Sequence, residues 1–184
     1  MQAALVEQAK RGDREAFDSL ARLVGDRCMA IALRILRDVD LAEDAVQESL
    51  ITAWREIRAL RDPDRFEPWL HRILTHACYA KAKQRRRWDE GIHLVPVEPV
   101  HGHDEYLTVD DRDQLEHAFR RLTLQQRAVL VFHYYLGLSI AEVAIRIGIP
   151  VGTAKSRLHH ATRALRASLE ADARASSQSQ ERMA

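Results

Sequence analysis

Apolar residues recur every three to four positions between residues 39 and 57, and this is the period of an amphipathic helix. The side predicted to face the core carries Val39, Ala42, Val46, Leu50, Ala53, Trp54 and Ile57. The opposite side carries Asp44, Gln47, Glu48, Ile51 and Arg55. An isoleucine among carboxylates has two readings. A single exposed apolar residue is common, and a small acidic, partly apolar face also suits the docking of a partner protein.

A second helix is predicted to begin near Pro68 and to continue past Arg86. Its predicted buried stripe consists of Trp69, Leu70, Ile73, Ala77 and Ala80. A different face carries Arg72, His76, Tyr79, Lys83 and Arg86. Cations interleaved with an aromatic ring suit single-stranded DNA, because the cations contact phosphates and a base can stack on the ring. The alternative is a helix end whose cations only face water. The preceding loop, residues 61–66, either holds an unstacked base or is an ordinary connector.

A third pattern, near the C-terminal end, predicts a helix-turn-helix. Ser139 and Glu142 have the spacing of a capping box, which marks the start of a short helix ending at Gly148. Pro150 is tolerated at the first turn of the next helix. That helix has a predicted buried stripe of Val151, Ala154, Leu158, Ala161 and Leu165. Small polar residues and long cations on its outward side are what a recognition helix needs in a DNA groove.

These patterns predict an all-α chain, since no long stretch alternates apolar and polar residues. Pro96 and Pro99 lie in an acidic stretch that cannot continue a helix. We therefore expect two small helical domains, 1–88 and 113–170, joined by an extended acidic linker over 89–112. The tail, 171–184, is small and polar and is predicted to be disordered.

Charge is strongly segregated, although the net charge is only +1. Residues 71–88 contain six Lys or Arg and no Asp or Glu, and residues 151–169 contain four and none. Residues 89–113 contain eight acidic residues and one Arg. One basic run is often just a solvated helix face, but two runs on two domains favour separate nucleic-acid contacts.

Several classes of protein are disfavoured by the sequence. The chain shows no P-loop, paired catalytic carboxylates or Ser/His/Asp grouping, so we expect no enzyme and no cofactor. His101 and His103 are the best metal candidates but lie in the linker, so no metal site is predicted. Cys28 and Cys78 are far apart, which favours free thiols in a reducing cytoplasm. No apolar run is long enough for membrane insertion.

Five stretches in this order resemble the bacterial RNA polymerase sigma factors of the extracytoplasmic-function group. They are RGDREAFDSL, DVDLAEDAVQESLITAW, RFEPWLHRI, KAKQRRR and GLSIAEVAIRIGIPVGTAKSRL, and the resemblance covers about residues 10–170. It implies a chain with a domain like sigma domain 2 and a domain like sigma domain 4. It also implies an alternative sigma factor that binds core RNA polymerase and directs initiation at particular promoters.

The resemblance further implies partners and contact residues. The β′ clamp helices would bind the segment carrying Asp40, Asp44, Gln47, Glu48 and Ile51. The −10 element, melted to a single strand, would meet Asp62, Arg65, Phe66, Arg72, His76, Tyr79, Lys83 and Arg86. The −35 element, as duplex, would meet Thr153, Lys155, Ser156, Arg157, His159, His160 and Arg163. The β flap is a further expected polymerase contact, and an anti-sigma protein is an expected inhibitor.

The chain departs from the family at a few positions. His76 stands where Asn is frequent, Ala80 lies near a frequent Asp, and His159 and His160 replace a frequent aromatic and Arg. These departures affect which promoter is read, but not the role. A dimeric helix-turn-helix repressor is the main rival, and it would leave the acidic face and the basic stripe without a function.

Overall fold

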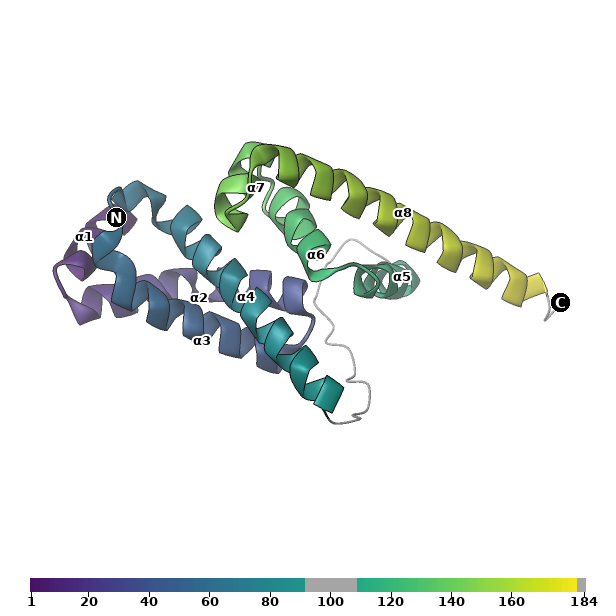
Figure 1. The fold of residues 1–184 in the computed structure, drawn as a ribbon, viewed down its shortest axis with the longest axis horizontal. Helices are drawn as coiled ribbons and strands as arrows, with labels where there is room; N and C mark the ends of the chain where they lie inside the picture. The colour runs from purple at the N-terminus through teal and green to yellow at the C-terminus, as the bar shows by residue number, and fades with distance from the viewer. Residues whose placement is uncertain (92–108, 182–184) are drawn as a thin grey trace.

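The computed structural model describes the backbone of residues 1–91 and 109–181 and the side chains of residues 1–88 and 114–174. Every regular element in these residues is helical, as the sequence predicts (Figure 1). The N-terminal half contains α1 (Gln2–Lys10), α2 (Arg14–Leu36), α3 (Val39–Glu56), the short turns η1 (Ile57–Ala59) and η2 (Pro63–Arg65), and α4 (Phe66–Gly91). The C-terminal half contains α5 (Val109–Arg120), α6 (Leu124–Leu130), the π-helical turn η3 (Val131–Tyr135), α7 (Ile140–Ile147) and α8 (Val151–Glu181).

Polar caps set where the N-terminal helices begin. The carboxylate of Asp13 accepts from the Ala16 N–H at 3.1 Å, and that of Asp38 accepts from the Leu41 N–H at 3.0 Å. Such caps satisfy backbone donors that have no partner inside the helix. Between α2 and α3, Arg37 adopts a left-handed conformation with φ 62°. The chain therefore reverses within two residues, and α2 and α3 pack side by side.

Small buried residues let α3 pack closely on its neighbours. Ala42 and Ala53 are buried as predicted, and Ala45 and Ser49 are buried without having been predicted. The Ser49 hydroxyl donates to the Val46 carbonyl at 2.7 Å, so its burial leaves no unpaired donor. In α4, Leu70 and Ala77 are buried as predicted, but Ala80 is exposed.

The helix-turn-helix has the local structure that its sequence predicts. Both halves of the Ser139–Glu142 capping box are formed, with the Ser139 N–H donating to the Glu142 carboxylate at 2.9 Å. Gly148 ends α7 in the left-handed region at φ 77°. A second capping box, Thr123 with Gln126, starts α6. Hydrogen bonding from Ser139 lowers the pKa of Glu142, so the carboxylate stays charged at the helix start.

Gly148 permits a comparison with a nearby glycine. We expect Gly148→Ala to lower the free energy of unfolding by about 1–2 kcal/mol, because a side chain strains the left-handed backbone. An added Cβ would also lie 2.9 Å from Nε of Arg72. Gly152 is helical with open space around it, so Gly152→Ala should raise stability by up to about 1 kcal/mol. Urea unfolding of both variants measures the difference, and equal midpoints would contradict the prediction.

Two boundaries predicted from the sequence differ from those in the structure. The prediction of a disordered tail from residue 171 is wrong over most of its length, because α8 continues to Glu181. Its Ala, Arg and Gln residues favour helix, and Arg121 holds Asp172 in an ion pair of 3.1 Å. The predicted linker, 89–112, is shorter at both ends, since α4 reaches Gly91 and α5 starts at Val109. Its remaining part, 92–108, lies outside the described residues.

The two helical halves contact each other. Buried apolar residues from both halves form one cluster, which includes Leu70 and Leu74 of α4 and Val129, Phe132 and Ile147 of the C-terminal half. Figure 1 shows α4 lying between the α2–α3 pair and the helix-turn-helix, while α8 extends away from the bundle. The sequence predicts two halves but contains no signal that they pack together.

Candidate functional site

The outward side of α3 forms an exposed acidic face, which we define as Asp40, Asp44, Gln47, Glu48 and Ile51. All five residues are exposed, and Ile51 is 44% exposed. The predicted orientation of this side of α3 is therefore correct. Such a patch, with one apolar residue among acceptors, can dock on a basic, partly apolar surface.

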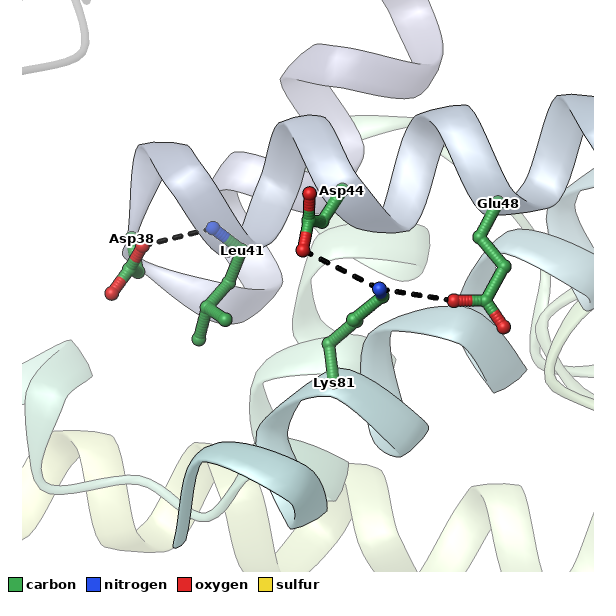
Figure 2. Close-up of polar contacts among 5 residues, drawn as sticks. All are labelled: Asp38, Leu41, Asp44, Glu48 and Lys81. Carbon is green, nitrogen blue, oxygen red and sulfur yellow. Dashed lines mark hydrogen bonds and ion pairs between the residues drawn. The ribbon is translucent and has the colours of Figure 1, made fainter. Parts of the chain in front are cut away.

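Lys81 of α4 joins two carboxylates of the acidic face (Figure 2). Its Nζ lies 3.1 Å from Glu48 Oε2 and 3.4 Å from Asp44 Oδ2. The hydrogen bond to Glu48 raises the pKa of Lys81, so the ammonium stays charged. Because Asp44 and Glu48 are four residues apart on one helix, a single cation can reach both. The sequence indicates only that Lys81 belongs to a basic run, because nothing local links residues so far apart in the chain.

The basic stripe of α4, which we define as Arg72, His76, Tyr79, Lys83 and Arg86, lies partly on the surface. The four cationic or imidazole side chains are exposed. Tyr79 is half-buried, and burial raises its pKa to about 12, with the charge of Arg157 on α8 partly offsetting the rise. The cationic side chains of the stripe are thus exposed to solvent, whereas the ring of Tyr79 is partly buried.

The loop before α4 differs from the prediction at one residue. Asp62 caps η2 by accepting from the Asp64 N–H, and it also pairs with Arg65 at 3.4 Å. Asp62 and Arg65 are exposed, in agreement with a surface role. Phe66 is only 1% exposed and its ring centroid lies 6.0 Å from that of Trp69. Phe66 is therefore a core residue, and its predicted contact with DNA is wrong for this conformation.

Helix α8 presents a polar outward face in its first turns. Lys155, Ser156, His159, His160 and Arg163 are exposed, whereas Thr153 and Arg157 are half-buried. The opposite stripe is buried at Ala154 and Ala161 as predicted, but Val151 is 53% exposed. Val151 stands at the first turn of α8, ahead of the packed part of the helix. An exposed apolar group there adds a surface that can contact a thymine methyl.

His71 and Arg146 form a polar contact that the sequence does not predict. His71 is 3% exposed, its ring centroid lies 5.6 Å from that of Phe132, and Arg146 Nε donates to its Nδ1 at 3.2 Å. Burial lowers the pKa of His71 to about 4, and the charges of Arg146 and Arg27 act in the same direction. The imidazole is therefore neutral at neutral pH. Its position in an apolar stripe of α4 was the only signal in the sequence.

The two cysteines are buried thiols. Cys28 and Cys78 are both 0% exposed, and burial raises the pKa of each thiol to about 12. Since the thiolate is the reactive form, only about one thiol in ten thousand is ionised at about pH 8. The arrangement disfavours a redox-sensing role for either residue.

We therefore expect both thiols to be inert in the folded chain. Ellman's reagent at about pH 8 should release almost no chromophore until denaturant is added, and then both thiols should react. An Asp18→Cys variant controls for the reagent, because Asp18 is exposed and should react at once. Fast reaction of native Cys28 or Cys78 would contradict the burial argument.

Neither a metal site nor a membrane-spanning helix is found in the described part of the chain. Within it, no three His, Cys, Asp or Glu side chains gather in a way that could hold a metal ion. The candidate pair His101 and His103 lies outside the described residues. Among the described helices, none combines the length and apolar character needed to cross a membrane.

Comparison with known proteins decides the family. The description "Sigma-70 region 2" matches residues 20–88, and "Sigma-70, region 4" matches residues 112–165. The ECF RNA polymerase sigma factor SigL of Mycobacterium tuberculosis is 34% identical over 170 residues, which cover 86% of this chain and 94% of SigL. The chain belongs to the ECF sigma factors. SigW of Bacillus subtilis, another ECF RNA polymerase sigma factor, is 27% identical over 176 residues, covering 89% of this chain and 94% of SigW.

This sigma factor directs promoter-specific initiation of transcription by RNA polymerase, and its family is not enzymatic. The match of region 2 to the N-terminal half rules out the rival repressor, which accounted only for the helix-turn-helix. Its fold is also found in the sigma factor RpoE, solved with the anti-sigma factor NepR from Bartonella quintana. That similarity has a TM-score of 0.69 at 28% identity, covering 85% of this chain and 98% of RpoE.

Proposed function

We propose that this sigma factor uses three separate surfaces to start transcription. The acidic face of α3 docks on the β′ clamp helices of core RNA polymerase. The basic stripe of α4 holds the melted −10 strand, with Asp62 and Arg65 at the edge of the site. The outward face of α8, including Thr153 and Arg157, reads the −35 duplex.

The observation that carries this proposal is the exposure of α8's outward residues. Lys155, His159 and Arg163 are exposed on one side of a helix whose other side is packed at Ala154 and Ala161. The short capped helix before it and the turn at Gly148 provide the geometry of a recognition helix. Long cations here suit phosphates, and the smaller Ser156 and the histidines suit base edges.

Run-off transcription tests the function as a whole. Core polymerase with the chain should start at discrete positions on fragmented genomic DNA, and sequencing of the RNA 5′ ends should yield shared −10 and −35 elements. Core polymerase alone is the control. Start sites that are the same with and without the chain would refute the proposal.

The docking surface is tested by variants that keep its shape. Asp44→Asn with Glu48→Gln removes two charges but leaves acceptors for Lys81, so the fold should not change. We expect the affinity for core polymerase to fall about tenfold, because complementary charge is lost. Asp18→Asn with Asp26→Asn on α2 is the matched control, since both residues are exposed and lie outside the acidic face. Equal polymerase binding by the two double variants would show that the acidic face does not dock.

Further partners follow from the same role. Because RpoE was solved with an anti-sigma factor, we propose that a protein of this class inhibits the chain. Such an inhibitor must compete with core polymerase in the binding assay above. The β flap is proposed as a contact of the C-terminal half. Because the chain would act on RNA polymerase and DNA, we propose that it functions in the cytoplasm.

A further inference from the structure

A cavity of about 490 Å³ lies between the C-terminal end of α2 and the helices α5, α6 and α8. Its walls are mostly apolar side chains, contributed by Leu33, Leu115, Phe119, Leu130, Val131 and Leu165. Packed interiors leave few voids larger than a water molecule, so this space exceeds what ordinary packing leaves empty. Its volume falls in the range of pockets that enclose small organic ligands.

The cavity opens to solvent beside the π-helical turn η3. Tyr134 and Tyr135 line it and are 64% and 45% exposed, so a small molecule can enter there without unfolding a helix. The guanidinium carbon of Arg34 lies 3.8 Å from the ring centroid of Tyr135, which holds that ring at the opening. Short π-helical turns are frequent at functional sites. The opening therefore has an aromatic rim with a cation beside it.

Cations gather at the end of the cavity that α2 forms. Arg34 and Arg37 both line it, and Arg37 pairs with Glu116 of α5. Burial lowers the pKa of Arg37 to about 10, and the charges of Arg127 and Arg120 act in the same direction. The pair with Glu116 alone therefore does not balance the positive charge. An additional anion at this end of the cavity would be stabilised.

Two of these arginines have buried donors to offer. Within the described residues, Arg37 Nε and Arg127 Nε are buried without a hydrogen-bond partner. Arg127 uses another donor, Nη1, for the Leu36 carbonyl at 3.5 Å. A buried charged donor without an acceptor is costly, and a carboxylate matches the geometry of a guanidinium. The cluster thus has the charge and the donors for a carboxylate, and the cavity beyond it has room for an apolar body.

We propose that this cavity binds a small amphipathic carboxylate, with the carboxylate on Arg37 beside Arg34 and an alkyl chain among the apolar walls. Glu116 competes with the ligand for the same guanidinium. The inference goes beyond the role in transcription and does not depend on it, because no residue of the three surfaces proposed for polymerase and DNA lines the cavity.

Calorimetric titration of the full chain tests the class of ligand. The probe is sodium octanoate, and we expect one site per chain with a Kd on the order of 0.1 mM for a ligand of about ten heavy atoms. Octanol has the same chain without the charge, and butyrate has the charge with a shorter chain. Each should bind about tenfold more weakly. If octanol or butyrate bound as tightly as octanoate, the proposal would be overturned.

A second test locates the ligand in the cavity. Leu33→Trp adds a bulky ring to the wall and should weaken octanoate binding about tenfold or more, because it occupies the space of the alkyl chain. Leu23→Trp is the matched control, since Leu23 lies on the same helix, is 53% exposed and is not part of the lining. Circular dichroism shows that both variants are folded. Equal affinities in the two folded variants would exclude this cavity as the site.

A third test locates the carboxylate with two variants that break the same ion pair. Arg37→Gln removes the cation, so octanoate should bind about tenfold more weakly. Glu116→Gln removes the competing carboxylate, so octanoate should bind about threefold more tightly. Loss of the ion pair by itself would shift both affinities in the same direction. Shifts of the same sign would therefore overturn the proposal, and this comparison decides even if Leu33→Trp does not fold.

A second copy of the chain would be a competing occupant of the cavity. Light scattering along the titration should show a monomer both with and without octanoate. If the chain were instead a dimer that octanoate or Leu33→Trp dissociates, the cavity would belong to an interface between copies, and the ligand site would be refuted.

Discussion

Replacing Phe66 with Ala should lower the free energy of unfolding by about 3–5 kcal/mol, the range for loss of a large aromatic side chain from a core. Phe66 is 1% exposed and contacts the ring of Trp69, so its removal leaves a cavity. Chemical denaturation followed by circular dichroism measures the change.

The neighbouring Arg65→Ala is the control for this loss. The Arg65 side chain is 73% exposed, and its ion pair with Asp62 is on the surface, so the change should stay within about ±0.5 kcal/mol. The comparison separates a core role from a base-holding role. If Phe66→Ala were as stable as Arg65→Ala but failed to open promoters, the ring would serve DNA rather than the core.

Acidification should destabilise the chain through His71. The pKa of this residue is lowered from 6.5 to about 4 in the folded chain. The unfolded chain therefore binds a proton more readily than the folded one. The stability that comes from keeping His71 neutral in the folded chain is fully present above pH 6.5, and it is lost as the pH falls towards 4. The loss should be about 2 kcal/mol between about pH 7 and about pH 5, and about 3 kcal/mol by about pH 4.

The physical reason lies in the surroundings of the ring. Protonation would place a cation beside Arg146 of α7 and Arg27 of α2, against the apolar ring of Phe132. It would also remove the acceptor that Arg146 uses. His71→Gln keeps an acceptor but does not titrate, so its stability should fall less over the same pH interval. Parallel curves for wild type and His71→Gln would contradict the argument and leave acid sensitivity to the carboxylates.

The orientation of the helix faces was predictable from the sequence because it depends on local periodicity. Asp44, Glu48 and Ile51 are exposed as the 3.6-residue period of the helix requires. The capping box at Ser139 and the left-handed turn at Gly148 were likewise predictable, since each involves residues close in the chain. The order of motifs was enough to identify the family resemblance, which the matches to regions 2 and 4 confirm.

Local pattern was misleading at helix ends and beside loops. Val151 continues an apolar period but precedes the packed part of α8, and Ala80 continues one in α4 beyond its buried stretch. Phe66 stands next to a polar loop, yet it points into the core. The tail was predicted to be disordered from its polarity, although its helix formers extend α8 to Glu181.

Three features depended on tertiary structure alone. Lys81 meets Asp44 and Glu48, Arg146 meets His71, and Gly148 meets Arg72, in each case across more than 30 residues of sequence. Periodicity determines which side of a helix is apolar, but not which neighbour that side meets. The sequence by itself therefore determined the elements, their faces and the family. Only the packing of α4 between the α2–α3 pair and the helix-turn-helix decided which charges are paired and which part of the basic stripe is covered.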